Sequence, residues 1–250
     1  MEVIQEILRR ALSVQPAPAP EVIVIIAVVA ALAVLIRPVW PVTRLLVTVT
    51  HEGAHGVAAL LSGRRLHGIR LHSDTSGLTL SSGRPSGPGM IIMLAAGYLG
   101  PALVGIGAAL LLAAGRGVGL LWLLVILLAL LLLQIRNFYG LLVVLGLGAA
   151  LVAITWFAPP TVQSGIAYLI TWLLLIAAPK PVLELIRHRH RPEIQDSDAH
   201  QLARLTRIPA IVWAVLFLLA NVAGLALGIG FLVPGLAERI GALLAAAGAG

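Results

Sequence analysis

Two histidines and a glutamate lie within five consecutive residues, His51-Glu52-Gly53-Ala54-His55. On a helix, residues four apart share one face, so both imidazoles can reach a single ion. Imidazole suits zinc, and a catalytic zinc site has three protein ligands and one water. The carboxylate after the first histidine can take a proton from that water as it attacks a carbonyl. The pentad therefore predicts a hydrolytic metal site, with His51 and His55 as ligands and Glu52 as general base.

The surrounding sequence makes this pattern more specific than it would be in a soluble protein. The pentad lies in an apolar segment that runs from Leu45 to Leu61. A carboxylate at the centre of a membrane span costs roughly 3 kcal/mol on insertion scales, so ionisable groups there usually have a function. The alternative is a trio of polar residues that pack between helices without a metal.

The composition is that of a membrane protein. Of the 250 residues, 60% are hydrophobic and 11% are charged, whereas a soluble domain is about 45–50% apolar and about 25% charged. These values exclude a soluble globule, a disordered chain and a disulfide scaffold. The absence of cysteine also excludes thiolate metal ligands and thiol nucleophiles.

Long apolar runs predict an all-α integral membrane fold with about seven transmembrane helices. We expect these helices at about residues 22–36, 42–62, 89–113, 118–135, 138–157, 162–178 and 209–233. Residues 22–235 then form a single polytopic domain, which an N-terminal segment (1–21) precedes and an Ala/Gly-rich tail (236–250) follows. The first run is short and could be a signal-peptide core, but the acidic, proline-rich leader is a poor signal.

The net charge of +7 is explained by topology. In a seven-span arrangement most of the 17 Lys and Arg fall on the side that holds the N-terminus and the polar segments 63–88 and 179–208. The positive-inside rule predicts that this side is cytoplasmic. Membrane lipid is then the expected partner of the basic residues, and nucleic acid is not. The sequence does not determine the oligomeric state.

A short β-hairpin is expected in the first polar segment. Ile69 and Leu71 alternate with polar residues, and Leu78 alternates with its polar neighbours in the same way, which is typical of two short strands. An edge strand could pair with an unwound substrate backbone, so we take these three residues as candidates for substrate binding. Asn137 either bonds between helices or joins them in holding a substrate backbone.

These motifs together resemble the site-2 protease family of intramembrane zinc metalloproteases, and its compact bacterial and plant branch in particular. Beyond the pentad, Gly97-Tyr98-Leu99-Gly100-Pro101 resembles the Gly-rich span that packs beside the zinc helix of that branch. Ser197-Asp198-Ala199 resembles its Ser-Asp-Ala element before the last span, and the stretch around residues 68–80 resembles its membrane-associated hairpin. The similarity covers about residues 42–215.

The resemblance implies one Zn²⁺ ion, hydrolysis of peptide bonds in a membrane protein or peptide, and a bacterial cell membrane as the location. The family takes its third ligand from a distant aspartate, often in an Asp-Gly pair, and this sequence has no such pair. Asp198 is the expected ligand through the Ser-Asp-Ala element, which must fold back into the bundle to reach the histidines. Asp196 or another group is the alternative. A catalytically silent metal-binding scaffold and a small-molecule transporter are the competing functions.

Overall fold

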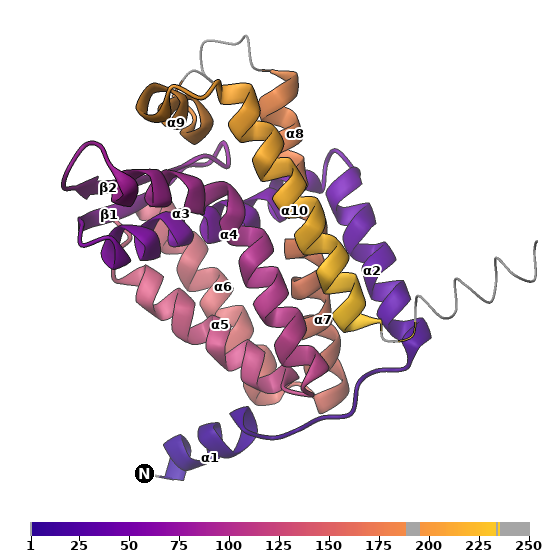
Figure 1. The fold of residues 1–250 in the computed structure, drawn as a ribbon. Coiled ribbons are helices and arrows are strands. Elements are labelled where there is room, and N and C mark those ends of the chain that lie inside the picture. Colours follow the sequence, from indigo (N-terminus) through magenta and orange to yellow (C-terminus); the bar gives the residue numbers. More distant parts are fainter. Residues whose placement is uncertain (1, 189–195, 234, 236–250) are drawn as a thin grey trace, which may run out of the picture.

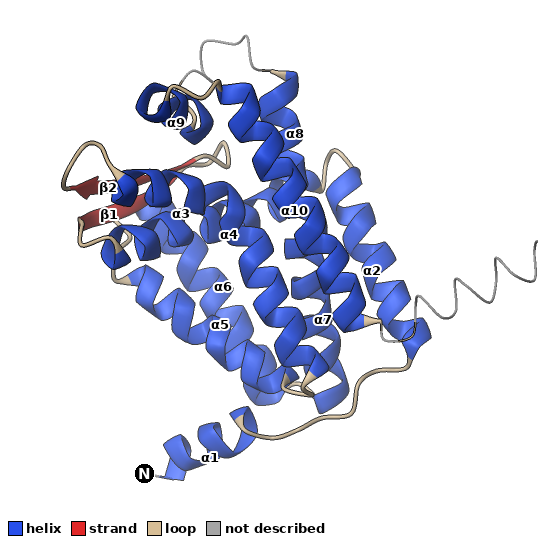
Figure 2. Cartoon of the chain, viewed as in Figure 1, coloured by secondary structure: helices blue, strands red, loops and turns tan. Residues whose placement is uncertain are grey.

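The computed structural model describes residues 2–188, 196–233 and 235 (Figure 1). Helices dominate it, and one small antiparallel sheet lies at an end of the helix bundle (Figure 2). The predicted tail, 236–250, lies outside the described residues. The elements are α1 (Glu2–Ala11), α2 (Pro20–Leu35), α3 (Trp40–Leu61), β1 (Arg65–Leu71), β2 (Gly77–Ser82), α4 (Pro88–Ala113), α5 (Gly117–Leu132), α6 (Phe138–Phe157), α7 (Pro160–Ala177), α8 (Pro179–Arg187), α9 (Asp198–Thr206) and α10 (Ala210–Leu232).

A helix occupies each of the seven predicted apolar segments, but seven membrane spans are not confirmed. Four helical stretches in the described part are long and apolar enough to cross a membrane: α4, α6, α10 and the stretch Pro160–Arg187, which contains α7 and α8. Counting α2 and α3 together as one bent span gives five. Helix α5 has 16 residues, or about 24 Å at 1.5 Å per residue, which is shorter than a hydrocarbon core of about 30 Å.

The break between α2 and α3 determines how the pentad is placed. The two helices are bent by 98°, so α3 runs across the bundle instead of returning through it (Figure 1). Pro38 and Pro41 lie at the break and lack the N–H groups that a continuous helix needs. The segment predicted as the second span therefore stays at the end of the bundle that also holds the hairpin, α8 and α9.

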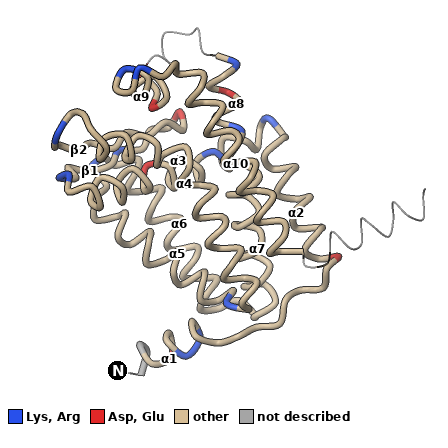
Figure 3. Tube along the Cα trace, viewed as in Figure 1, with Lys and Arg blue, Asp and Glu red and all other residues tan. Residues whose placement is uncertain are grey.

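The bend changes where the expected segments lie in the bundle. Helix α1 lies at the end of the bundle opposite to the hairpin, α8 and α9 (Figures 1 and 3). It is held there by Arg10 Nη1, which donates to the Trp156 carbonyl at 3.2 Å, and by Gln15 N–H, which donates to the Gly115 carbonyl. The N-terminal arginines and the described parts of the two long polar segments lie at opposite ends of the bundle, because α3 runs across the bundle instead of through it. Most of the described Lys and Arg lie at the hairpin end (Figure 3).

The hairpin forms as predicted, with an antiparallel register from Arg65↔Ser82 to Leu71↔Gly77. A segment that the sequence assigned to the end of the fourth span also joins the sheet. Ile69 N–H donates to the Gln134 carbonyl at 2.7 Å, and Arg136 N–H donates to the Ile69 carbonyl at 2.9 Å. These bonds follow directly on the end of α5 at Leu132, and they occupy the second edge of β1 at Ile69. Within the described residues, no strand pairs with the outer edge of β2.

Candidate metal centre

Three side chains meet where the start of α9 approaches α3. His51 Nε2 and His55 Nε2 lie 3.0 Å apart, and each lies 3.2 Å from Asp198 Oδ2. A tetrahedral zinc ion with bonds of about 2.0–2.2 Å requires ligand atoms roughly 3.3 Å apart. Two imidazole nitrogens and a carboxylate oxygen at these separations fit such an ion, and the group could hold a metal.

Helix α4 packs against the two histidines and fixes their positions. His55 Nδ1 lies 2.7 Å from the Met93 carbonyl, so a proton on Nδ1 leaves Nε2 free to bind a metal. A Cβ atom at Gly97 would lie 2.4 Å from His55 Nε2 and 2.6 Å from His51 Nε2. At Gly100 a Cβ would lie 2.4 Å from the Ala54 methyl group. The Gly-rich element therefore packs against the pentad, and its missing side chains make room for both imidazoles.

Asp198 comes from a different part of the chain and is placed by the anchoring of α9. It is the first residue of that helix. Ala199 and Leu202 are fully buried in an apolar cluster that includes Leu94 of α4 and Phe217 of α10. This packing folds the segment back onto the bundle. The alternative ligand Asp196 points away, with a side chain that is 95% exposed and lies 3.6 Å from Arg204.

The electrostatics keep Asp198 in the form that binds a cation. Burial alone would raise the pKa of its carboxyl group, but the adjacent imidazoles of His55 and His51 outweigh that effect and hold the pKa well below its usual value. The side chain is 12% exposed. An ionised, largely buried carboxylate needs a positive partner. Protonated imidazoles can supply that charge, and a metal ion held by neutral imidazoles would take their place.

Glu52 lies on the same helix but turns toward the hairpin. It is 5% exposed, and its Oε2 accepts a hydrogen bond of 2.6 Å from the Thr79 hydroxyl of β2. This places an acidic group between the ligand helix and β2, where it could accept a proton from a water that attacks a nearby carbonyl.

The candidate substrate residues fall into two groups. Ile69 and Leu71 are 1% and 0% exposed and pack in a cluster with Val49 and Val144. Asn137 is also engaged: its side-chain N–H donates to the Leu71 carbonyl at 2.7 Å, and its Oδ1 accepts from the Leu71 N–H at 3.2 Å. These three residues hold β1 in place. Leu78, on β2, is 46% exposed.

Sequence reasoning did not find Thr79, Gly77 or Tyr98 as site residues. The Tyr98 ring meets the His51 ring edge-on, with centroids 5.0 Å apart. Tyr98 carried a signal, because it follows Gly97 in the Gly-rich element. Thr79 and Gly77 carried none, since small polar residues are ordinary in a hairpin and only the fold brings them to Glu52.

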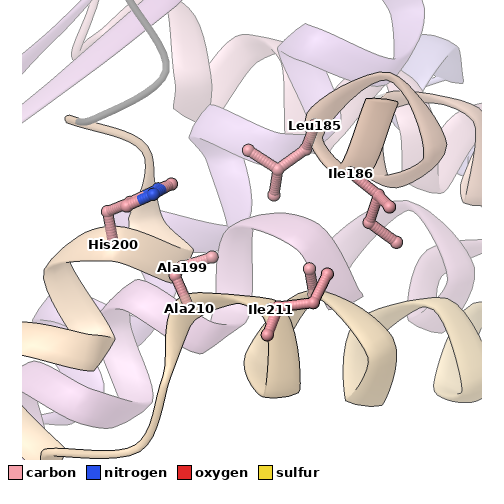
Figure 4. Close-up of a pocket in the computed structure, with 7 residues that line it drawn as sticks. Leu185, Ile186, Ala199, His200, Ala210 and Ile211 are labelled. Atoms are coloured by element: carbon pink, nitrogen blue, oxygen red, sulfur yellow. The ribbon is translucent and has the colours of Figure 1, made fainter. Parts of the chain in front are cut away.

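A cavity of about 220 Å³ lies between α8, α9 and α10 (Figure 4). Its lining is apolar apart from one imidazole and consists of Leu185, Ile186, Ala199, His200, Ala210, Ile211 and Ala214. None of the residues grouped around His51 and Glu52 lines it, so this cavity is separate from the candidate metal centre.

A partly buried group of contacts at the hairpin end connects the start of α3 to α8. Glu184 of α8 accepts a hydrogen bond of 2.9 Å from the Trp40 indole and pairs with Arg44 at 3.0 Å. The same Trp40 ring lies 3.9 Å from the Lys180 ammonium group. These contacts orient the ligand helix relative to the elements that carry Asp198.

The chain matches a protein-family model. The family model described as Peptidase M50B-like matches residues 24–228, a range that contains every residue of the candidate site. Neither the curated proteins nor the solved structures include a significant match.

Proposed function

Because this chain belongs to the Peptidase M50B-like family, a site-2 protease family of metallopeptidases, we propose that it is an intramembrane zinc metalloprotease. Its substrates are membrane-embedded proteins or peptides. The observation that carries the proposal is the meeting of Asp198, from α9, with His51 and His55 at 3.0–3.2 Å. The two histidines lie on α3, the helix that also presents Glu52. A transporter needs no such general base beside a ligand triad.

The chemistry follows from the roles of these side chains. His51, His55 and Asp198 would hold one Zn²⁺, which polarises a carbonyl and acidifies a water when it is bound. The Glu52 carboxylate takes a proton from the attacking water. It returns that proton to the amide nitrogen as the carbon–nitrogen bond breaks. The products are one new carboxyl group and one new amino group, so a water is consumed for each bond cut.

The free edge of β2 is the proposed site of substrate backbone binding. In an antiparallel pair, residues that do not exchange hydrogen bonds with their partner turn their N–H and C=O outward. Ile69 gives both of its backbone groups to the 134–136 segment, so its partner Thr79 directs its own backbone groups to the open edge. A substrate that has lost its helical hydrogen bonds can pair there, directly beside Glu52.

This proposal assigns different roles to the candidate substrate residues. Leu78 is placed to contact a bound peptide or lipid, whereas Ile69, Leu71 and Asn137 act indirectly by supporting the sheet. A proline at Ile69 or Leu78 would break bonds within the sheet and would not test the open edge. A peptide substrate with N-methyl groups at alternate residues tests it better: methylation in one register should reduce cleavage, and methylation in the other should not.

The orientation in the membrane is also a proposal. The hairpin end carries most of the described Lys and Arg (Figure 3), so the positive-inside rule places it, together with the site, at the cytoplasmic face. Helix α1 then lies at the opposite face. Location in a bacterial cell membrane rests on the resemblance to the compact branch of site-2 proteases.

Metal analysis combined with a cleavage assay tests the function. The purified full chain should hold about one zinc. It should cut a quenched-fluorescent peptide with about 20 apolar residues and a central helix-breaking Gly-Pro pair. Glu52→Gln should keep the zinc and lose cleavage by about 100-fold or more. A zinc-loaded wild-type protein that cuts no membrane peptide would favour the silent scaffold, and full cleavage by Glu52→Gln would exclude the mechanism.

A further inference from the structure

The carboxylate of Glu52 is held by the hairpin and not by its own helix bundle. Thr79 Oγ1 lies 2.6 Å from Glu52 Oε2 and 3.2 Å from the Glu52 backbone carbonyl. The shorter contact is the one expected for a hydroxyl that donates to a charged acceptor. Among the described residues, Thr79 is the one hydrogen-bond donor to this carboxylate. The orientation of the proposed general base therefore depends on β2.

Gly77 makes the space that the carboxylate occupies. A Cβ atom at this position would lie 2.5 Å from Glu52 Cγ, 2.6 Å from Oε1 and 2.7 Å from Cδ. Gly77 does not have a positive φ, so residues other than glycine could adopt its backbone conformation. The need for glycine is one of space. Gly77 and Thr79 are two residues apart and face the same side of the sheet, so together they form a notch for Glu52.

Thr79 faces Glu52 with its side chain and the open edge of β2 with its backbone. Its side chain faces Glu52, and its backbone N–H and C=O face the open edge of β2, as its pairing with Ile69 requires. The neighbouring residues Leu78 and Leu80 direct exposed side chains to the opposite face. One strand therefore presents a backbone edge for a peptide and, through the same residue, holds the base.

We propose that Thr79 and Gly77 are positioning residues for Glu52, so that the strand that receives the substrate also sets the geometry of the proton acceptor. This inference rests on the proposed proteolytic function. It predicts that the Thr79 hydroxyl contributes to turnover through Glu52 and contributes little to metal binding or to peptide affinity.

The test uses the full chain in detergent, the same quenched-fluorescent apolar peptide and four variants. Thr79→Val removes the hydroxyl and keeps the shape. It should lower kcat by about 10- to 100-fold, the range expected for a hydrogen bond to a charged group, with KM and zinc content close to wild type. Thr79→Ser restores a hydroxyl and should recover most of the turnover. Gly77→Ala tests the notch without changing Thr79, and should lower kcat with zinc retained.

Ser81→Ala is the matched control. Ser81 lies on the same face of β2, and its hydroxyl contacts Met93 Sδ and Arg64 at 3.2 and 3.1 Å instead of Glu52. This variant should keep wild-type kcat. Wild-type turnover in Thr79→Val would overturn the proposal, as would equal losses in Thr79→Ser and Thr79→Val. Wild-type turnover in Gly77→Ala would overturn the role given to Gly77. If Glu52→Gln is inactive while Thr79→Val is fully active, only this inference fails. If the wild type does not cleave, the proposed function itself fails.

Discussion

The two strands of the hairpin have similar sequence patterns and opposite situations in the fold. Strand β1 pairs with β2 along one edge and, at Ile69, forms a bridge to residues 134–136 on the other, and its apolar residues Ile69 and Leu71 are buried. Strand β2 has an unpaired edge within the described structure, and its apolar residues Leu78 and Leu80 are 46% and 39% exposed. In the hairpin, β1 therefore supports the fold, whereas β2 is the strand proposed to bind the substrate backbone and to position Glu52. Changes in β1 should destabilise the fold, and changes in β2 should reduce catalysis in a folded protein.

The largest loss of stability is expected from Leu71→Ala in β1. Truncating a fully buried leucine costs about 2–5 kcal/mol in the free energy of unfolding, and Leu71 is 0% exposed. Leu80→Ala in β2 is the control and should change stability by less than about 1 kcal/mol, because much of that side chain is already in contact with the surroundings. Thermal unfolding in detergent, followed by circular dichroism, measures both. Equal shifts in Tm would remove the distinction between the strands.

A pair of glycine substitutions gives the next largest contrast. Gly68 of β1 has φ +143°, and a Cβ there would lie 2.9 Å from the Gln134 carbonyl. Gly68→Ala should therefore cost about 1–3 kcal/mol of stability through backbone strain. Gly77→Ala should leave Tm nearly unchanged and reduce cleavage. If Gly77→Ala lowers Tm as much as Gly68→Ala does, the proposed difference between a structural β1 and a catalytic β2 is wrong.

Asn137→Ala should have a moderate effect. The variant removes two hydrogen bonds to the Leu71 backbone, and each is worth about 1 kcal/mol net. The loss should appear as faster amide hydrogen exchange along β1, with zinc content unchanged. An activity loss without any change in exchange would instead indicate direct contact of Asn137 with the substrate.

The smallest effect is expected from Leu78→Ser. Stability should stay within about 0.5 kcal/mol of wild type, since nearly half of the side chain is exposed. Losing a partial apolar contact to a bound peptide should raise KM about 5-fold, which corresponds to burying little more than one methylene group. Kinetics with the fluorescent peptide measure this, and an unchanged KM would assign Leu78 to lipid contact only.

The parts of the site that were predictable are those encoded locally. The positions i and i+4 of His51 and His55 share a helix face whatever the rest of the chain does. The alternation around Ile69 predicted a strand, and the structure contains it. Neither pattern shows which edge of a strand remains open. That depends on residues 134–136, and the length of the apolar run predicts a helix that extends to residue 135.

The parts that were not predictable depend on contacts between distant segments. Asp198 was indicated only by its short element, and its approach to His51 and His55 depends on the burial of Ala199 and Leu202. The seven-span arrangement assumed that every apolar run crosses the membrane. The structure does not confirm that assumption: α3 follows a 98° bend, and composition records how apolar a helix is and not the direction in which it runs.

Because of the bend, the depth of a residue of α3 in the membrane does not follow from its position in the sequence. In the proposed orientation, with α2 along the bundle axis, a helix at 98° to it would lie close to the plane of the membrane, and each further turn of about 5.4 Å would move a residue sideways. The depth of the metal centre is then set by where α2 ends. Lengthening α2 by one turn should lower or raise the centre relative to the lipid headgroups. Shifting the pentad by one turn along α3 would instead keep its depth and move it toward or away from the hairpin.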